Sequence, residues 1–141
     1  MAFSKPRREL EPRWVSDYMA KFYPKAEVRM RVPLGPIPKE TQKDYGLMKG
    51  LRVYRPWRPE VDAIVILPGA LKLIEAKIFK YMDGLSKLPV YASLVESTPE
   101  LQHVRDRPVQ MTLLIPAEIT WVKQAAAGLK IDVVVWAPEY I

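Results

Sequence analysis

The sequence predicts an α/β (α+β) fold in which helices flank a mixed central β-sheet, in the order α-β-β-β-α-β-α-β. Two observations support this prediction. Residues 60–79 are a hydrophobic ribbon with a Pro-Gly pair in its middle, a pattern typical of a β-hairpin at the centre of a sheet. Residues 109–137 follow the order strand, helix, strand, which predicts a right-handed parallel crossover.

The segments before the ribbon predict a helix, a strand and a loop. Residues 1–10 are a basic lead that we expect to be flexible, and residues 11–141 are expected to form a single domain. Residues 11–23 carry apolar side chains at spacings of three and four, which predicts a helix. Residues 26–34 alternate apolar and basic side chains, as a half-exposed strand does. Residues 35–50 are rich in Pro, Gly and polar residues, which predicts a loop with at most one short turn of helix.

The ribbon itself divides into strands at residues 60–67 and 71–79, and a helix is expected to follow it. This helix covers residues 82–98, and if Ser86 caps it, Pro89 lies in its first turn, where the missing N–H is harmless. The remaining expected elements are strands at 109–115 and 131–137 and a helix at 117–128 that ends at Gly128.

Composition narrows the classes of function. The chain has 141 residues, 49% of them hydrophobic, which suits one domain with its own core. Cysteine is absent, which excludes disulfides, thiolate zinc sites and a cysteine nucleophile. Without an apolar signal or membrane-spanning segment, we expect no membrane association and a cytoplasmic location, or a virion if the gene belongs to a phage. The net charge of +6 fits either a solvated basic surface or binding to nucleic acid.

Three ionisable residues, Asp62, Glu75 and Lys77, interrupt the hydrophobic ribbon, where buried charges are costly. The hairpin can close through residues 68–69, which places Asp62 opposite Glu75, or through residues 69–70, which places Asp62 opposite Lys77. Paired residues share a face of a sheet, and so do residues two apart on one strand. In both registers the three charged side chains therefore project from the same side of the ribbon.

Two adjacent carboxylates repel each other unless a cation neutralises them. Oxygen ligands at this spacing suit Mg²⁺ or Mn²⁺, and Lys77 would lie beside the metal, where it can orient or polarise a water molecule. This arrangement suits metal-assisted hydrolysis of a phosphodiester. The alternative is a purely structural ion pair. Because buried ion pairs stabilise proteins poorly, we favour the functional site.

The residues Asp62 and Glu75-Ala76-Lys77, placed on a strand-turn-strand after a helix and a strand, resemble the motif of the PD-(D/E)XK nuclease superfamily. The segment "DGLSKLPVYASLVESTPEL" after the ribbon is similar to the helix of the lambda-exonuclease and RecB-like branch, with Lys87 where that branch has glutamine. The resemblance covers roughly residues 10–115 and implies a restriction-endonuclease-like core.

The resemblance also implies roles for individual residues. Asp62 and Glu75 would bind the metal through their side chains, and Ala76 through its carbonyl oxygen. Lys77 would hold the attacking water. An upstream acidic residue is expected as well, for which Glu27 is the first choice and Glu11, on the first helix, the second. Lys87 and Tyr91, on the helix after the ribbon, would contact nucleic acid, or Tyr91 would brace the site.

The segment "RVYRPWRPE" immediately before the ribbon interleaves basic and aromatic residues and predicts a strand or edge segment over residues 51–58. Arginines in such a segment can bind phosphates while aromatic rings stack on bases. The same charges would also protect an edge strand from pairing with another chain. The candidate nucleic-acid contacts are Arg52, Arg55, Trp57 and Arg58.

Together these features lead us to expect a Mg²⁺-dependent nuclease, endonuclease or exonuclease, that acts on DNA. A chain of 141 residues leaves no room for a separate specificity domain, so we expect a homo-oligomer or a subunit of a larger phage or mobile-element assembly. One alternative is a nuclease-fold protein that no longer cuts and serves as a structural or DNA-contacting component, as in a virion neck or a transposition complex. Another is a basic nucleic-acid-binding module with a fortuitous motif.

Overall fold

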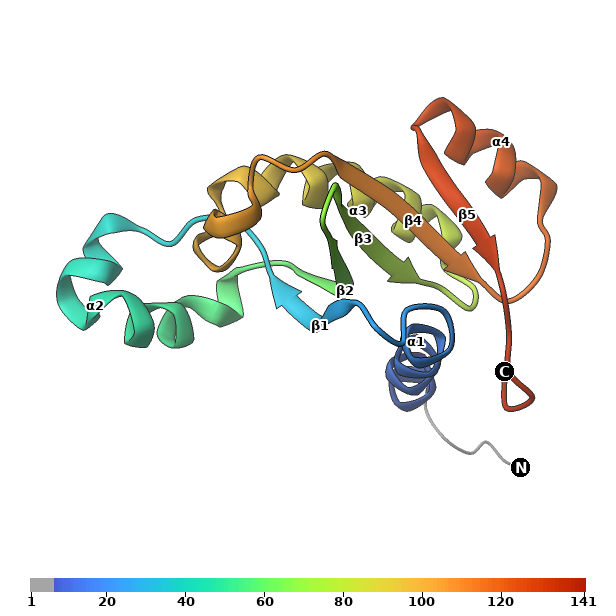
Figure 1. Cartoon of the computed structure of the whole chain (residues 1–141), viewed down its shortest axis with the longest axis horizontal. Helices are drawn as coiled ribbons and strands as arrows, with labels where there is room; N and C mark the ends of the chain where they lie inside the picture. Colours follow the sequence, from blue (N-terminus) through green and yellow to red (C-terminus); the bar gives the residue numbers. More distant parts are fainter. Residues whose placement is uncertain (1–6) are drawn as a thin grey trace.

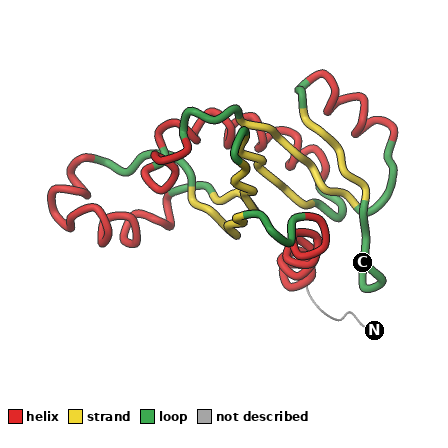
Figure 2. Tube along the Cα trace, in the orientation of Figure 1, coloured by secondary structure: helices red, strands yellow, loops and turns green. Residues whose placement is uncertain are grey.

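The structure, a computed structural model, describes residues 7–141, and the side chains from residue 10 onward. Its centre is a five-stranded sheet with the spatial order β1-β2-β3-β4-β5 (Figures 1 and 2). The strands are β1 Glu27–Pro33, β2 Glu60–Leu67, β3 Ala70–Ala76, β4 Val109–Ile115 and β5 Ile131–Val135. β1, β2 and β3 pair antiparallel, whereas β3, β4 and β5 pair parallel. The predicted mixed sheet and its parallel crossover are confirmed.

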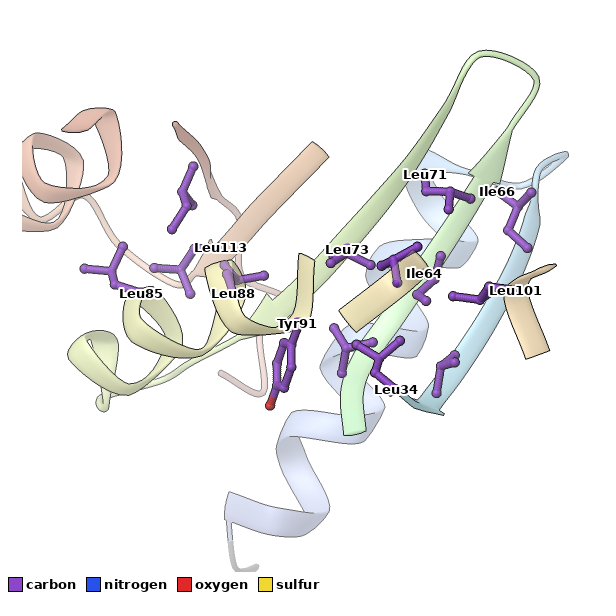
Figure 3. Close-up of a cluster of buried hydrophobic side chains, with 14 of the residues drawn as sticks. Leu34, Ile64, Ile66, Leu71, Leu73, Leu85, Leu88, Tyr91, Leu101 and Leu113 are labelled. Carbon is purple, nitrogen blue, oxygen red and sulfur yellow. The ribbon is translucent and has the colours of Figure 1, made fainter. Parts of the chain in front are cut away.

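Helices cover both faces of this sheet. The covering helices are α1 Arg7–Phe22, α3 Tyr81–Leu94 and α4 Thr120–Gly128, whereas α2 Lys39–Tyr54 extends away from the sheet. Short 3₁₀ segments are η1 Arg55–Trp57, η2 Val95–Ser97 and η3 Pro99–Val104. On one face α3 and α4 bury their apolar side chains against the central strands, and Figure 3 shows Leu73 and Ile64 of the sheet among the leucines of this cluster. On the other face Trp14 and Tyr18 of α1 pack against β2 and β3. No helix in residues 7–141 has the length and hydrophobicity that crossing a bilayer requires.

The segment after β5 holds α1 in place. The indole N–H of Trp14 donates a hydrogen bond to the carbonyl oxygen of Trp136, over 3.1 Å. The hydroxyl of Tyr140 donates to the carboxylate of Asp17, and the guanidinium of Arg13 lies 3.9 Å from the centre of the Tyr140 ring. The orientation of α1 therefore depends on residues more than 120 positions away in the sequence.

The largest difference from the sequence prediction is α2. Residues 39–54 are helical where we expected a loop over 35–50 and a strand or edge segment over 51–58. The helix is broken at Gly46, whose φ of 77° and ψ of 171° lie outside the helical region, and 42–49 are all exposed. With no buried face there is no apolar periodicity for a helix prediction to detect. Residues 55–57 continue as the 3₁₀ segment η1.

The ends of other helices also differ. α1 begins at Arg7 rather than at residue 11, so residues 7–10 of the expected flexible lead are helical, while residues 1–6 lie outside the described part of the chain. α3 begins at Tyr81, five positions before Ser86, which therefore does not cap it, and Pro89 lies inside the helix. The acidic Asp83 in its first turn suits the positive end of the helix dipole.

A buried ion pair fixes the segment between α2 and β2. Arg58, whose side chain is 1% exposed, forms a bidentate pair with Glu100 of η3, with both distances 2.7 Å. The same guanidinium donates to the carbonyl oxygen of Gly35 over 2.8 Å. Burial tends to raise the pKa of Glu100, but the hydrogen bonds from Arg58 prevail and hold this pKa below its usual value. Arg58 thus joins η1, η3 and the loop after β1.

We predict that Glu100→Ala destabilises the protein by about 3–5 kcal/mol, because it leaves a buried guanidinium without its counter-ion. Urea denaturation followed by circular dichroism measures the loss. The exposed Glu96→Ala, in the neighbouring segment η2, is the matched control and is expected to change stability by less than about 0.5 kcal/mol. Equal stability of the two variants would show that the Arg58 pair contributes nothing to the fold.

Candidate active site

The candidate site lies where the β2–β3 hairpin ends. The two strands pair from Leu67 opposite Ala70 to Ala63 opposite Ile74, so the hairpin closes through Pro68-Gly69. This is the first of the two registers considered above, and its next pair is Asp62 and Glu75. At that pair the side chains take over the hydrogen bonds: the Asp62 N–H donates to Glu75 Oε1, and the Ala76 N–H donates to Asp62 Oδ2, each over 2.9 Å. Both carboxylates are therefore held against the backbone.

Burial sets the electrostatics of this pair. Glu75 is only 2% exposed and Asp62 is partly buried. Burial raises the pKa of Glu75 to about 8, and the negative charge of Asp62 contributes to the shift. Burial also raises the pKa of Asp62, against the opposing effect of the Ala76 hydrogen bond and of Lys77. The protein thus brings two carboxyl groups together in surroundings that favour their protonated forms.

Lys77 supplies part of the compensating charge. Its Nζ lies 3.8 Å from Glu75 Oε2 and 3.2 Å from Asp83 Oδ2, and its side chain is 15% exposed. Burial lowers the pKa of Lys77, but the carboxylates of Glu75 and Asp83 outweigh it, and the net shift is upward. Asp83 also accepts a hydrogen bond from Lys87 over 2.9 Å, and this bond lowers the pKa of Asp83. Lys77 therefore remains an ammonium group fixed between two acidic residues.

Gly84 of α3 permits the close approach of this helix to Lys77, a role that the sequence analysis did not predict. A methyl group on Gly84 would lie 2.6 Å from Leu113 Cδ1 and 3.0 Å from Lys77 Cγ. Any other residue at position 84 would push α3 away from the sheet or displace the lysine. The only sequence signal is a glycine inside a helical pattern, next to the acidic residue that contacts Lys77.

Of the two candidates for the upstream acidic residue, Glu11 is the one that reaches the site. Its carboxylate accepts a hydrogen bond from the N–H of Ile78 over 3.2 Å, immediately after Lys77. Glu11 also lines two adjoining pockets, one of about 240 Å³ with Lys77 and Asp83 and one of about 460 Å³ with Asp62. α1 thus closes over the end of the hairpin from the side opposite α3.

Glu27 lies away from this cluster. The β1–β2 ladder pairs Glu27 with Ile66, four residues along β2 from Asp62, or about 13 Å. Its carboxylate forms an exposed pair with Arg29 over 2.9 Å. In β1, Val32 pairs with Val61 and Met30 with Ala63, so the β1 residue at the level of Asp62 is Arg31. Arg31 lines the larger pocket together with Asp62.

The expected nucleic-acid contacts separate into exposed and buried residues. Arg52 and Trp57 are exposed, and Trp57, 70% exposed, stacks on Tyr54 with ring centres 5.7 Å apart. Arg55 is also exposed, and it pairs with Glu60 over 2.9 Å. Arg58 is committed to Glu100 in the interior, so its expected contact with nucleic acid does not fit the structure. The reason is that its side chain turns into the core just before β2 begins.

Lys87 and Tyr91 occupy different environments on α3. Lys87 is exposed and joins the site through Asp83. Tyr91 is 5% exposed and belongs to the core, with its hydroxyl directed away from Leu88 and Leu113 (Figure 3). Burial raises the pKa of Tyr91, and the charges of Glu75 and Asp62 raise it further, which places the hydroxyl within their field. Tyr91 thus suits bracing of the site rather than contact with nucleic acid.

The donor set fits a hard divalent cation with few protein ligands. In residues 10–141 no three acidic, histidine or cysteine side chains gather closely enough to hold a metal by themselves. Mg²⁺ is commonly bound by one or two protein carboxylates and keeps several water ligands, so Asp62 and Glu75 supply the type and number of ligands that it needs. Burial raises the pKa of both carboxyl groups, and a cation bound between them would favour their ionised forms.

Comparison with known proteins identifies the fold. No protein-family model and no curated protein matches the sequence. The structure of a repair endonuclease from Pyrococcus abyssi is similar, with a TM-score of 0.51 and 13% identity, covering 98% of this chain and 50% of that one. A protein of unknown function is also similar, with a TM-score of 0.50 and 14% identity, covering 94% of this chain and 59% of that one. The chain thus spans about half to three-fifths of their lengths, and the predicted restriction-endonuclease-like fold is confirmed.

We predict that the metal-free protein loses stability as the pH rises from about 4.5 to about 8. The pKa of Glu75 is 4.5 when unperturbed and about 8 in the fold, so in this window the folded protein retains a proton that the unfolded chain has released. The stabilisation is complete below pH 4.5 and is lost as the pH passes through 8. Urea denaturation with a chelator present, at several pH values, measures the slope. Glu75→Gln should make it shallower, and an equal slope in the variant would contradict the assignment.

We also predict that Gly84→Ala destabilises the protein by about 1–3 kcal/mol, because the added methyl group overlaps the fully buried Leu113. The matched control is Gly128→Ala at the end of α4, where an added methyl group meets nothing within 4 Å. That variant should be neutral, or more stable by up to about 1 kcal/mol. Thermal unfolding of both variants makes the comparison, and an equally benign Gly84→Ala would mean that α3 is free to shift.

Proposed function

We propose that this protein is a divalent-metal-dependent nuclease that hydrolyses phosphodiester bonds in DNA. The observation that carries the proposal is the buried pair Asp62 and Glu75 with the ammonium group of Lys77 beside it. Fixed, partly uncompensated charges of this kind cluster at functional sites. The net charge of +6 and the fold shared with a repair endonuclease support a nucleic-acid substrate.

The proposed metal ligands are the carboxylates of Asp62 and Glu75 and the carbonyl oxygen of Ala76, and the proposed metal is Mg²⁺ or Mn²⁺. When bound there, the ion would lower the pKa of a coordinated water and stabilise negative charge on the phosphate. The hydrogen bonds from the backbone to Asp62 and Glu75 keep their oxygens in position before any ligand arrives. Rigid placement of this kind reduces the reorganisation needed during the reaction.

Lys77 is the proposed group for positioning the attacking water. Its ammonium group remains protonated, so it donates hydrogen bonds to the water and to the phosphate and stabilises the negative charge that develops there. Asp83 fixes its direction from one side and Glu75 from the other. Gly84 of α3 leaves the space that this position of the lysine needs, because an added methyl group there would lie 3.0 Å from Lys77 Cγ.

For the upstream acidic residue we propose Glu11 rather than Glu27. Glu11 lies at the boundary of the pockets that hold Lys77 and Asp62, so it can bind the ion through a water or orient the nucleophile. Glu27 is exposed, pairs with Arg29 and lies opposite Ile66. The two glutamates therefore form a natural test pair.

The wider setting remains a proposal drawn from the sequence. We propose that the chain works in the cytoplasm or a virion, as a homo-oligomer or as a subunit of a phage or mobile-element assembly, and that it belongs to the lambda-exonuclease and RecB-like branch. The exposed Arg52, Trp57 and Lys87 are its proposed contacts with DNA. The alternative of a nuclease-fold protein that binds DNA without cutting it is an outcome of the experiment below.

We predict that the purified protein cleaves supercoiled or linear DNA in the presence of Mg²⁺ or Mn²⁺ and is inactive in a chelator. Asp62→Asn, Glu75→Gln and Lys77→Ala should each reduce the cleavage rate at least about 100-fold, since each removes a charged group from the reacting centre. The first two substitutions keep an oxygen that can accept the backbone hydrogen bond, so the fold should survive. Gel electrophoresis of timed reactions gives the rates.

The controls are Glu27→Gln and Lys25→Ala, which remove one charge of each sign from exposed positions and should leave the rate unchanged. Glu11→Gln should reduce it, which separates the two upstream candidates. Cleavage that survives all three site substitutions would falsify the proposal. Binding of DNA without cleavage by the unaltered protein would favour the non-cutting alternative.

A further inference from the structure

Helix α2 forms an arm, residues 39–54, that extends from the end of the molecule away from the sheet (Figure 1). Gly46 divides it into two helical halves, and a residue other than glycine is disfavoured there because φ is positive. The halves lie close together at Gly50, where an added methyl group would lie 3.4 Å from the carbonyl oxygen of Thr41 in the first half. Gly50 is also the one buried residue of the arm, so the arm contributes almost nothing to either core.

The apolar side chains at the tip of the arm are exposed. Tyr45 and Leu47 are each 47% exposed and Met48 is 70% exposed, on either side of the bend at Gly46. Helices this short are only marginally stable in water unless their apolar side chains are packed. Since the described part of the chain does not cover the tip, a partner molecule is the remaining source of such packing.

The charges of the arm select the partner. Its exposed cations outnumber its two anions, Glu40 and Asp44. These cations are Lys39, Lys43, Lys49 and Arg52. A second copy of the chain would bring its own net charge of +6 toward this basic surface, which is unfavourable, whereas a polyanion neutralises it.

The base of the arm reaches the candidate site. Arg55, directly after α2, donates to the carbonyl oxygen of Arg31 over 2.9 Å. Arg31 has a φ of 52°, an uncommon conformation for a residue with a side chain. Its side chain is 71% exposed and lines the pocket of about 460 Å³ that contains Asp62. Arg55 and Arg31, which both pair with Glu60, therefore connect the base of the arm to the pocket that contains Asp62.

We propose that α2 is a binding arm for duplex DNA. It contacts the duplex beside the phosphodiester bond that lies at Asp62. The lysines of the arm contact phosphates, and Leu47 and Met48 enter the minor groove, where apolar side chains inserted between base steps bend the duplex. The inference rests on the proposed function, because it specifies the substrate of the proposed nuclease. That substrate is a DNA duplex that extends past the reacting bond.

The test is binding of a fluorescently labelled duplex about three helical turns long, in a chelator so that no cleavage occurs. The tip variant Leu47→Ser/Met48→Ser should bind about tenfold more weakly, and energy transfer between dyes on the two ends should no longer report bending. The lysine variant Lys43→Gln/Lys49→Gln removes two cations of the arm. It should reduce the slope of log K against log salt concentration by about 2. Val90→Ser, at a 54% exposed position on α3, is the control for the tip and should bind normally.

Unchanged affinity and bending in both arm variants would overturn the inference, and so would failure of the unaltered protein to bind the duplex. Sedimentation tests whether a second copy of the protein is the partner instead. Self-association that the tip variant abolishes, with DNA affinity unchanged, would assign the arm to a protein interface. Because binding is measured without metal, it is independent of cleavage. If the arm variants bind DNA more weakly but the unaltered protein does not cut it, the inference about the arm stands and the nuclease proposal is rejected. If both arm variants cut DNA at the normal rate, the nuclease proposal stands and the inference about the arm is rejected.

Discussion

The two hydrogen bonds that the backbone donates to the carboxylates of Asp62 and Glu75 are the interaction on which the rest of the site depends. Further along the hairpin the strands exchange backbone N–H and carbonyl groups. Here the Asp62 N–H of β2 donates to the Glu75 carboxylate of β3, and the Ala76 N–H of β3 donates to the Asp62 carboxylate of β2. The apolar neighbours Ala63 and Ile74 are fully buried, so the sheet cannot slide to expose these carboxylates. Two carboxyl groups that are costly to ionise are thereby kept in fixed positions at the edge of a hydrophobic core.

The elements around this pair approach it from opposite faces of the sheet. α3 brings Asp83 and, through the missing side chain of Gly84, leaves room for Lys77. α1 brings Glu11 to the backbone just beyond Lys77. The site is therefore a junction of three elements around one hairpin end. Burial and the charge of Asp62 raise the pKa of Glu75 to about 8, and Lys77 offsets this shift only in part. This imbalance is the physical reason for proposing a divalent cation.

The sequence predicted the sheet and the carboxylate pair well because both depend on local patterns. Period-two hydrophobicity and a short turn determine which face Asp62 and Glu75 occupy, whatever the register. It missed α2, since a helix exposed on all sides has no apolar stripe, and "LRVYRPWR" alternates like a strand. It ranked Glu27 above Glu11 because the approach of α1 is a tertiary feature. The burial of Arg58 likewise follows from a partner, Glu100, that lies 42 residues away.

The contacts between α1 and the segment after β5 imply an order of assembly. The hairpin that carries Asp62 and Glu75 needs only neighbouring residues, and such local structure forms quickly. Glu11 reaches the hairpin only when α1 is docked, and its docking includes the Trp14 bond to Trp136, a closure of 122 residues. We therefore expect a folding chain to hold the carboxylate pair well before Glu11 joins it. Chemistry that needs all three residues would be withheld from partly folded molecules.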